Sequence, residues 1–285
     1  MKKKIQGLWI EEGMDEAYST NLFYNNTVEI AEAFAEYFTQ SQLTNLVLTA
    51  MEELTGSRAK VSLAAAQLMS AVMKKRGSDL IKVEEILVGI LERLKLQLEP
   101  NTKEETLRAL CLLAGNCTHS VVPLLLNRPL PWDRTILAPW RLFGTERKTT
   151  INVLQLLIGI LENHSTEGTT EKALEPEEEA FALCEMLSGT LCREAILELY
   201  PRLLLAVLCH LFWVIEQKIP KNMVVYRKVG GSGKTFDPTS CALEVVKLVF
   251  FAAAYDGVVV YADEHKCWDH LSSSKFYYRG IMDLT

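Results

Sequence analysis

The 285-residue sequence has no surplus of basic residues, and this bears on its partners. Lys and Arg number 30 against 36 Asp and Glu, which gives a formal net charge of −6. A nucleic-acid-binding surface needs excess positive charge to neutralise phosphates. The composition therefore argues against a nucleic-acid partner.

The sequence also lacks closely spaced cysteine pairs. None of the seven cysteines stands in a CxxC motif, and several lie in apolar helical stretches, where a reduced cysteine behaves as a small hydrophobic residue. No signal peptide is predicted after the N-terminal lysines, because Gln6, Glu11, Glu12 and Asp15 interrupt any apolar region. We therefore expect a reduced, cytoplasmic protein.

Long apolar runs are missing as well. The most apolar stretch, residues 203–215, has 13 residues and includes His210. A membrane-spanning helix needs about 20 apolar residues, so no integral membrane segment is predicted. A membrane-associating adaptor stays open as an alternative if this helix is exposed. We expect His210 to be a core or groove residue. The tryptophans predicted to pack in the core are Trp132, Trp140, Trp213 and Trp268.

Strand patterns are rare, apart from a short β-prone patch at residues 258–261 (VVVY). Most of the chain instead has apolar residues at helical spacing, joined by short polar loops. The clearest predicted helices span residues 43–54, 58–75, 149–163 and 193–218. The pattern predicts an all-α chain.

Three regions follow from this pattern. Residues 1–26 are a polar lead-in that we expect to be partly disordered, and residues 27–285 form helical repeats. The longest interruption, at about residues 219–238, is predicted to be a flexible loop. The chain stops in what resembles the middle of a repeat, which predicts truncation within the repeat array.

One segment of the sequence recurs. Residues 86–92 (ILVGILE) return 70 positions later as residues 156–162 (LLIGILE). This interval is about two periods of the stacked helical pairs that build solenoids. It favours an armadillo/HEAT-type α-solenoid of stacked antiparallel helix pairs. A mid-helix glycine costs about 1 kcal/mol relative to alanine, so Gly89 and Gly159 are both predicted to admit a closely packed neighbouring helix.

A glycine-rich segment could be mistaken for a nucleotide site. Residues 228–235 (KVGGSGKT) match the phosphate-binding loop except at Lys228, where the motif requires glycine. Such a loop must open a helix, and Pro238 follows too soon. We expect the segment from Gly230 to Thr235 to be a flexible turn, with nucleotide binding there as the alternative function.

Residues 263–270 (DEHKCWDH) concentrate potential metal ligands on a predicted helix that spans residues 263–271. Lys266 and His270 would share one helix face, and His265 and Asp269 another, so no tetrahedral set forms. The segment also offers a cysteine and histidines for nucleophilic catalysis, but no oxyanion loop accompanies them. We predict a solvated, charged helix here, with no metal, cofactor or catalytic site in the chain.

Several motifs together resemble the maestro HEAT-like repeat family. They are residues 130–134 (LPWDR), 140–144 (WRLFG), 182–187 (ALCEML), 198–204 (ELYPRLL), 241–244 (CALE) and 258–261 (VVVY). The resemblance covers about residues 100–285, and the first hundred residues match only as generic helical repeat. It implies an intracellular α-solenoid without catalytic residues. We therefore expect a non-enzymatic scaffold or adaptor that binds other proteins.

Overall fold

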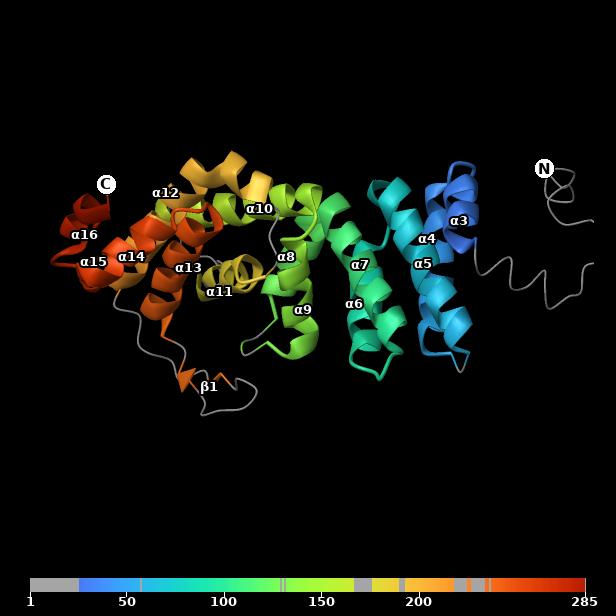
Figure 1. Ribbon diagram of the computed structural model, residues 1–285. Helices are drawn as coiled ribbons and strands as arrows, with labels where there is room; N and C mark the ends of the chain where they lie inside the picture. The colour runs from blue at the N-terminus through green and yellow to red at the C-terminus, as the bar shows by residue number, and fades with distance from the viewer. Residues whose placement is uncertain are drawn as a thin grey trace, which may run out of the picture. The chain divides into compact units, whose positions relative to one another are not determined.

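The computed structural model describes residues 26–284 except residues 57, 129, 131, 167–175, 190–192, 218–224, 227–233 and 236. The described residues form helices and short turns, with one two-stranded ribbon (Figure 1). The predicted all-α class is therefore confirmed. The predicted lead-in, apart from residue 26, and most of the predicted loop at 219–238 lie outside the described residues.

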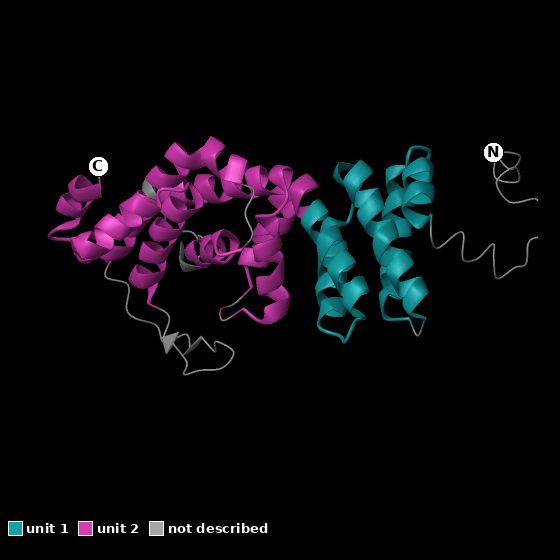
Figure 2. Ribbon diagram, viewed as in Figure 1, with its two compact units in different colours: residues 1–113 teal, residues 114–285 magenta. Residues whose placement is uncertain are grey.

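The chain divides into two compact units, Met1–Leu113 and Ala114–Thr285 (Figure 2). The helices of the first unit pack mainly against neighbours one or two places along the chain, as in stacked helix pairs: α3 and α4 both contact α5, and α4 contacts α6. Its elements are α3 (Thr27–Ala35), α4 (Gln40–Glu52), η1 (Glu53–Thr55), α5 (Ala59–Arg76), η2 (Gly77–Asp79), α6 (Val83–Leu94) and most of α7 (Pro100–Asn116).

Polar side chains fix the helix ends of the first unit. Thr39 and Gln42 form a capping box at the start of α4, where each side chain bonds to the other residue's backbone N–H. Arg76 donates hydrogen bonds from its guanidinium to the carbonyl oxygens of Ala35 and Phe38, both 2.7 Å away, and so satisfies the end of α3. Arg76 also pairs with Asp79 at 2.6 Å. These bonds hold α3 to the end of α5.

The helices of the second unit differ widely in length, from 5 residues in α15 to 25 in α12. Within this unit α10 packs against α12, α12 against α13, and α11 against both α9 and α13. Its helices are α8 (Thr118–Leu126), α9 (Arg134–Phe143), α10 (Arg147–Thr166), α11 (Pro176–Leu187), α12 (Arg193–Gln217), α13 (Pro238–Ala252), α14 (Asp256–Glu264), α15 (Cys267–Leu271) and α16 (Tyr277–Leu284). Strands β1 (Val225–Tyr226) and β2 (Lys234–Thr235) pair in antiparallel fashion.

An aromatic cluster forms part of the second unit's core. The rings of Trp132 and Trp140 stack with centroids 5.6 Å apart, and Phe181 meets Trp132 edge-on at 5.2 Å. Such pairs add to the free energy gained from burial alone. Trp132, Trp140 and Trp268 are buried as predicted, whereas Trp213 is only half-buried.

The end of the second unit departs from two predictions. The β-prone patch at residues 258–261 is helical and belongs to α14, so that prediction was wrong. The single helix predicted over residues 263–271 is divided, because Lys266 takes a left-handed conformation (φ 57°) between α14 and α15. A left-handed residue cannot continue a right-handed helix. Residues 277–284 form a further helix, α16, which was not predicted.

Candidate functional site: a polar groove along helix α10

The glycine-rich segment does not open a helix. Lys234 and Thr235, which would hold phosphate and Mg²⁺ in a nucleotide site, lie in strand β2 opposite Tyr226 and Val225. Helix α13 begins only at Pro238. A phosphate site needs the N–H groups of a helix start directly behind the lysine. The described part of the segment does not provide this geometry, and residues 227–233 lie outside the described residues.

The two histidines of the candidate metal segment, residues 263–270, have different hydrogen-bond partners. His265 Nδ1 lies 2.9 Å from the carbonyl oxygen of Tyr261, and His270 Nδ1 lies 3.0 Å from Asp283 Oδ2 on α16. Lys247 on α13 approaches Asp263 at 3.8 Å. Within the described ranges, no three His, Cys, Asp or Glu side chains gather as metal ligands would.

The cysteine of the same segment is not poised for nucleophilic chemistry. Cys267 is fully buried, and burial raises the pKa of its thiol, with the Asp283 carboxylate adding to the increase. A raised pKa keeps the thiol protonated, whereas the thiolate is the reactive form. The environment of Cys267 therefore favours a structural role.

Helix α12 is an apolar core element of the second unit. It runs for 25 residues with Pro201 inside it and corresponds to the helix predicted over residues 193–218. By length and composition it could cross a membrane, a test that core helices of soluble proteins also pass. Its buried residues recur at three- and four-residue spacing: Ala195, Ile196, Leu199, Leu203, Ala206, Val207, His210, Leu211 and Val214. His210, 4% exposed, is thus a core histidine as predicted.

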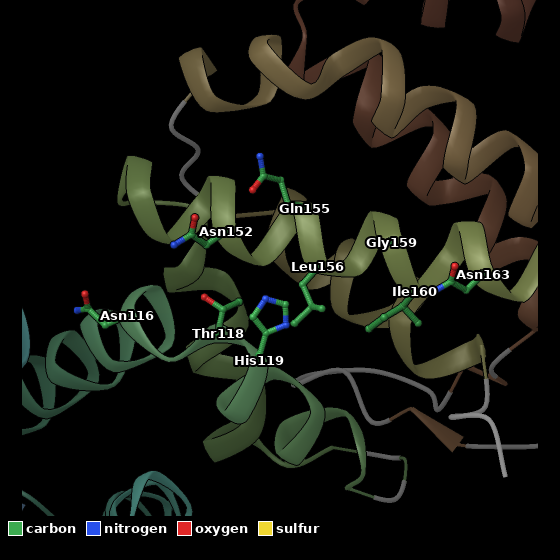
Figure 3. Close-up of a pocket in the computed structure, with 9 residues that line it drawn as sticks. All are labelled: Asn116, Thr118, His119, Asn152, Gln155, Leu156, Gly159, Ile160 and Asn163. Atoms are coloured by element: carbon green, nitrogen blue, oxygen red, sulfur yellow. The ribbon is translucent and has the colours of Figure 1, made fainter. Parts of the chain in front are cut away.

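A pocket of about 490 Å³ opens on the second unit, along one face of α10 (Figure 3). The end of α7 and the start of α8 supply its other lining residues, among them His119. On α10 the lining includes Asn152, Leu156, Gly159 and Asn163, which follow one another at four-, three- and four-residue spacing. This spacing places them on a single helix face. We call this pocket the α10 groove.

Close packing of α7 on α10 builds one end of the groove. A Cβ atom at Gly115 would overlap the side chain of Thr149, so glycine is needed for this approach. Asn152 Nδ2 donates a 2.8 Å hydrogen bond to the carbonyl oxygen of Gly115. Lys148 Nζ donates to Asn116 Oδ1 at 2.6 Å. These two bonds fix the carboxamides of Asn116 and Asn152 at the groove's edge.

The described lining of the groove is polar. None of the described lining residues carries a carboxylate, ammonium or guanidinium group. Leu156 and Ile160 form a half-buried apolar floor, and Gly159 lies between them. Nothing lies within 4 Å of the position that a Cβ of Gly159 would take. The prediction that a neighbouring helix packs closely on Gly159 was therefore wrong. The glycine faces open space.

Two polar groups of the groove have no partner within the described part of the chain. Gln155 is exposed on α10 and His119 is exposed on α8, and Figure 3 draws both side chains beside the pocket. Asn152 uses its nitrogen for Gly115, which leaves its carbonyl oxygen as an acceptor with no described partner. The groove can therefore both donate and accept hydrogen bonds.

Two ionisable residues next in sequence to lining residues, Glu162 and Cys117, have shifted pKa values. Arg202 on α12 donates two hydrogen bonds to the carboxylate of Glu162, at 2.8 and 2.5 Å, and these bonds lower the pKa of Glu162. Cys117, which precedes α8, has its thiol pKa raised by burial, against the opposing effect of Lys148. A raised pKa keeps the Cys117 thiol protonated, and the Glu162 carboxylate is held by Arg202.

The groove was not predicted from the sequence, although part of its signal is present there. Gly159 was assigned to helix packing, and the polar residues around it were not predicted to form a site. Asn152, Gly159 and Asn163 stand at seven- and four-residue spacing in a helix otherwise rich in Leu and Ile. Polar or bare positions repeated on one helical face indicate a surface that is not covered by the core. This pattern could have indicated the exposed face of α10, although not the neighbouring residues of α7 and α8.

Helices that pack mainly against their neighbours along the chain are typical of helical-repeat proteins of the scaffold type. Comparison with known proteins identifies the family. A family model described as Maestro, HEAT repeats matches residues 2–154, and the chain belongs to this family. Most of the matched residues lie in the first hundred residues, where the motifs gave only a generic helical-repeat resemblance. The HEAT-type fold class predicted from the recurring segment is thereby confirmed.

Curated relatives cover nearly the whole chain. Mouse Maestro heat-like repeat-containing protein family member 1 is 27% identical over 97% of this chain and 18% of its own length. Human member 1 is 24% identical over 92% of this chain and 17% of its own length, and human member 9 is 22% identical over 91% and 44%. The chain thus spans less than a fifth of the member 1 relatives. One solved structure, the crystal structure of an engineered protein, aligns over 95% of this chain and 76% of the engineered chain, with a TM-score of 0.31.

Proposed function

We propose that this chain is a non-enzymatic scaffold or adaptor that binds another protein through the α10 groove. The observation that carries the proposal is the groove itself: a 490 Å³ opening whose lining offers hydrogen-bonding groups without charge. General acid–base catalysis needs a positioned titratable side chain within hydrogen-bond reach of the reacting group. Among the described lining residues His119 is the one titratable side chain, and none is a carboxylate.

Family membership supports the same function. HEAT-type repeats stack into long surfaces in which each repeat contacts mainly its neighbours, and such surfaces hold other proteins. The chain spans a small part of the length of these relatives, so we propose this function for the chain itself and not for the whole of a longer protein. The net charge of −6 is consistent with a protein partner rather than a nucleic acid.

We place this activity in the cytoplasm. Six of the cysteines are described, and all six are thiols rather than halves of disulfides: Cys111, Cys117, Cys184, Cys209, Cys241 and Cys267. Free thiols on a chain with this many cysteines are expected in a reducing compartment. Cell fractionation tests the location, and recovery of the chain in a secreted or lumenal fraction would contradict it.

Quantitative affinity capture from cells tests the binding function. The test variant carries His119→Ala and Gln155→Ala, which remove two exposed groove groups that have no described partner. The matched control carries His265→Ala and Gln217→Ala, which remove the same residue types from exposed positions outside the groove. We expect the groove variant to lose a set of partners that the control retains. Identical partner sets for the wild-type chain and both variants would refute the proposal.

A further inference from the structure

We propose that the α10 groove binds an extended peptide segment of its partner and recognises the peptide backbone. This inference rests on the proposed function and specifies the partner's chemistry. It begins from the kind of polar group that lines the groove. Asn116, Asn152, Gln155 and Asn163 supply carboxamides to the lining. Lys148 already donates to the oxygen of Asn116, and the nitrogen of Asn152 donates to Gly115, so the Asn152 oxygen and the whole Gln155 carboxamide are the groups presented to a ligand.

A peptide group has the same hydrogen-bonding character as a carboxamide. Each one presents an N–H donor and a C=O acceptor without net charge. An extended segment leaves these groups unsatisfied, whereas an α-helix has bonded nearly all of its own internally. A helical ligand would need a broad apolar stripe on its receptor. The floor here offers only the half-buried Leu156 and Ile160. The lining therefore favours an extended ligand.

The dimensions of the groove set the length of the ligand. Asn152 and Asn163 are 11 positions apart on α10, which corresponds to about 16 Å along a helix axis. An extended chain advances about 3.3 Å per residue. The groove face is therefore spanned by about five peptide residues.

Gly159 supplies a place for one side chain of the peptide. A side chain at this position would point into open space, so its absence leaves a notch between Leu156 and Ile160. The walls of this notch are aliphatic, so an apolar peptide side chain is the residue that fits it. Because none of the described lining residues is charged, the core of the bound segment is expected to be uncharged as well.

The test uses peptides of known sequence. Random linear peptides are displayed against the purified chain, and an enriched sequence is synthesised with acetylated and amidated ends. Its Kd is measured by fluorescence polarisation, and each backbone nitrogen is then methylated in turn. N–H groups of an extended chain point to alternate sides, so methylation at two or more alternate positions should weaken binding at least tenfold. Affinity should change less than threefold between 50 and 500 mM salt, since the lining carries no charge.

Variants of Gly159 place the peptide in the groove. Gly159→Leu should fill the notch and weaken binding at least tenfold, while the thermal midpoint of the chain stays within about 2 °C of wild type or rises. Gly159→Ala is the matched control, because its Cβ meets nothing, and it should weaken binding less than threefold. Unchanged binding to Gly159→Leu would show that the peptide sits elsewhere and would overturn the inference.

Two further outcomes would also overturn it. One is that no peptide is enriched, and the other is that the enriched peptides bind as helices, with affinity raised by helix-stabilising substitutions and no alternation in the methylation scan. If cellular partners are still lost in the His119 and Gln155 variant, the scaffold function stands and the groove binds a folded surface. If that variant keeps every partner, the proposed function fails as well.

Discussion

The same seven-residue pattern serves two different purposes in the two units. In α6 of the first unit it packs Gly89 against the Met51 side chain of α4, where a Cβ on the glycine would overlap the methionine's end. In α10 of the second unit it leaves Gly159 facing an open groove. A mid-helix glycine therefore does not by itself indicate close packing. Its role depends on which face of the helix the neighbours cover.

Burial shows how the two copies differ. In α6 the aliphatic residue before the glycine, Val88, is 37% exposed, and its equivalent in α10, Ile158, is fully buried. On the other side of the glycine the order reverses, because Ile90 is fully buried and Ile160 is half-buried. Successive residues are about 100° apart around a helix. Counted from the shared glycine, different positions of the seven-residue pattern are therefore buried in α10 and in α6.

The glutamate that ends each copy differs in the same way. Glu92 pairs with Lys95, the residue that follows the end of α6, at 2.8 Å. Glu162 pairs instead with Arg202, which lies on α12. One copy uses the glutamate locally, and the other uses it to join two helices.

The largest expected effect comes from filling the close contact of the first unit. Gly89→Leu should lower the free energy of unfolding by about 1–3 kcal/mol, because the added side chain overpacks the buried contact with Met51. Urea unfolding followed by circular dichroism measures this change. Met51→Ala should partly relieve the overpacking, so the double variant should lose less than the sum of the two single losses. Strict additivity would show that the two residues do not meet.

The next largest expected effect is a rise in the free energy of unfolding, at Gly159 of the second unit. Gly159→Ala should raise the free energy of unfolding by up to about 1 kcal/mol, because alanine favours the helix and its Cβ meets no atom. Gly89→Ala is the comparison, and it should gain less because Met51 must shift. Equal gains at both positions, measured by urea unfolding, would remove the distinction between the two copies.

The smallest expected effect concerns the ion pair between α10 and α12. Arg202→Ala should cost at most about 1 kcal/mol at pH 7, since both side chains are partly exposed. Arg202 lowers the pKa of Glu162, so the pair stabilises the fold above the carboxyl's ordinary pKa and loses this contribution as the pH falls through the lowered value. The difference between variant and wild type should be steady from pH 8 to 6 and vanish in strong acid. A difference that grows on acidification would contradict this assignment.

Much of the fold follows from local pattern, because apolar residues at helical spacing must be buried together. The predicted helix at residues 58–75 corresponds to α5, and that at 149–163 lies within α10. The β-prone patch at 258–261 was mispredicted because its valines are β-branched, yet tertiary packing places them in α14. The break at Lys266 left no trace in the sequence, since lysine rarely adopts a positive φ.

The candidate site was harder to predict than the fold. Its polar residues come from three helices, and their proximity depends on the close approach of α7 to α10 at Gly115 and Thr149. Sequence spacing could place Asn152 and Asn163 on one face of α10 but could not show that His119 lies beside that face. The openness around Gly159 is likewise a property of packing, which no local pattern specifies.

The most direct test of the two roles compares Gly89→Leu and Gly159→Leu in the same two assays, urea unfolding and affinity capture from cells. We predict that Gly89→Leu lowers the unfolding midpoint and, under conditions where it remains folded, keeps the wild-type partners. Gly159→Leu should keep the midpoint at or above wild type and lose the partners that depend on His119 and Gln155. A lowered midpoint with retained partners for Gly159→Leu would contradict the account, because it would show a packing glycine in both copies.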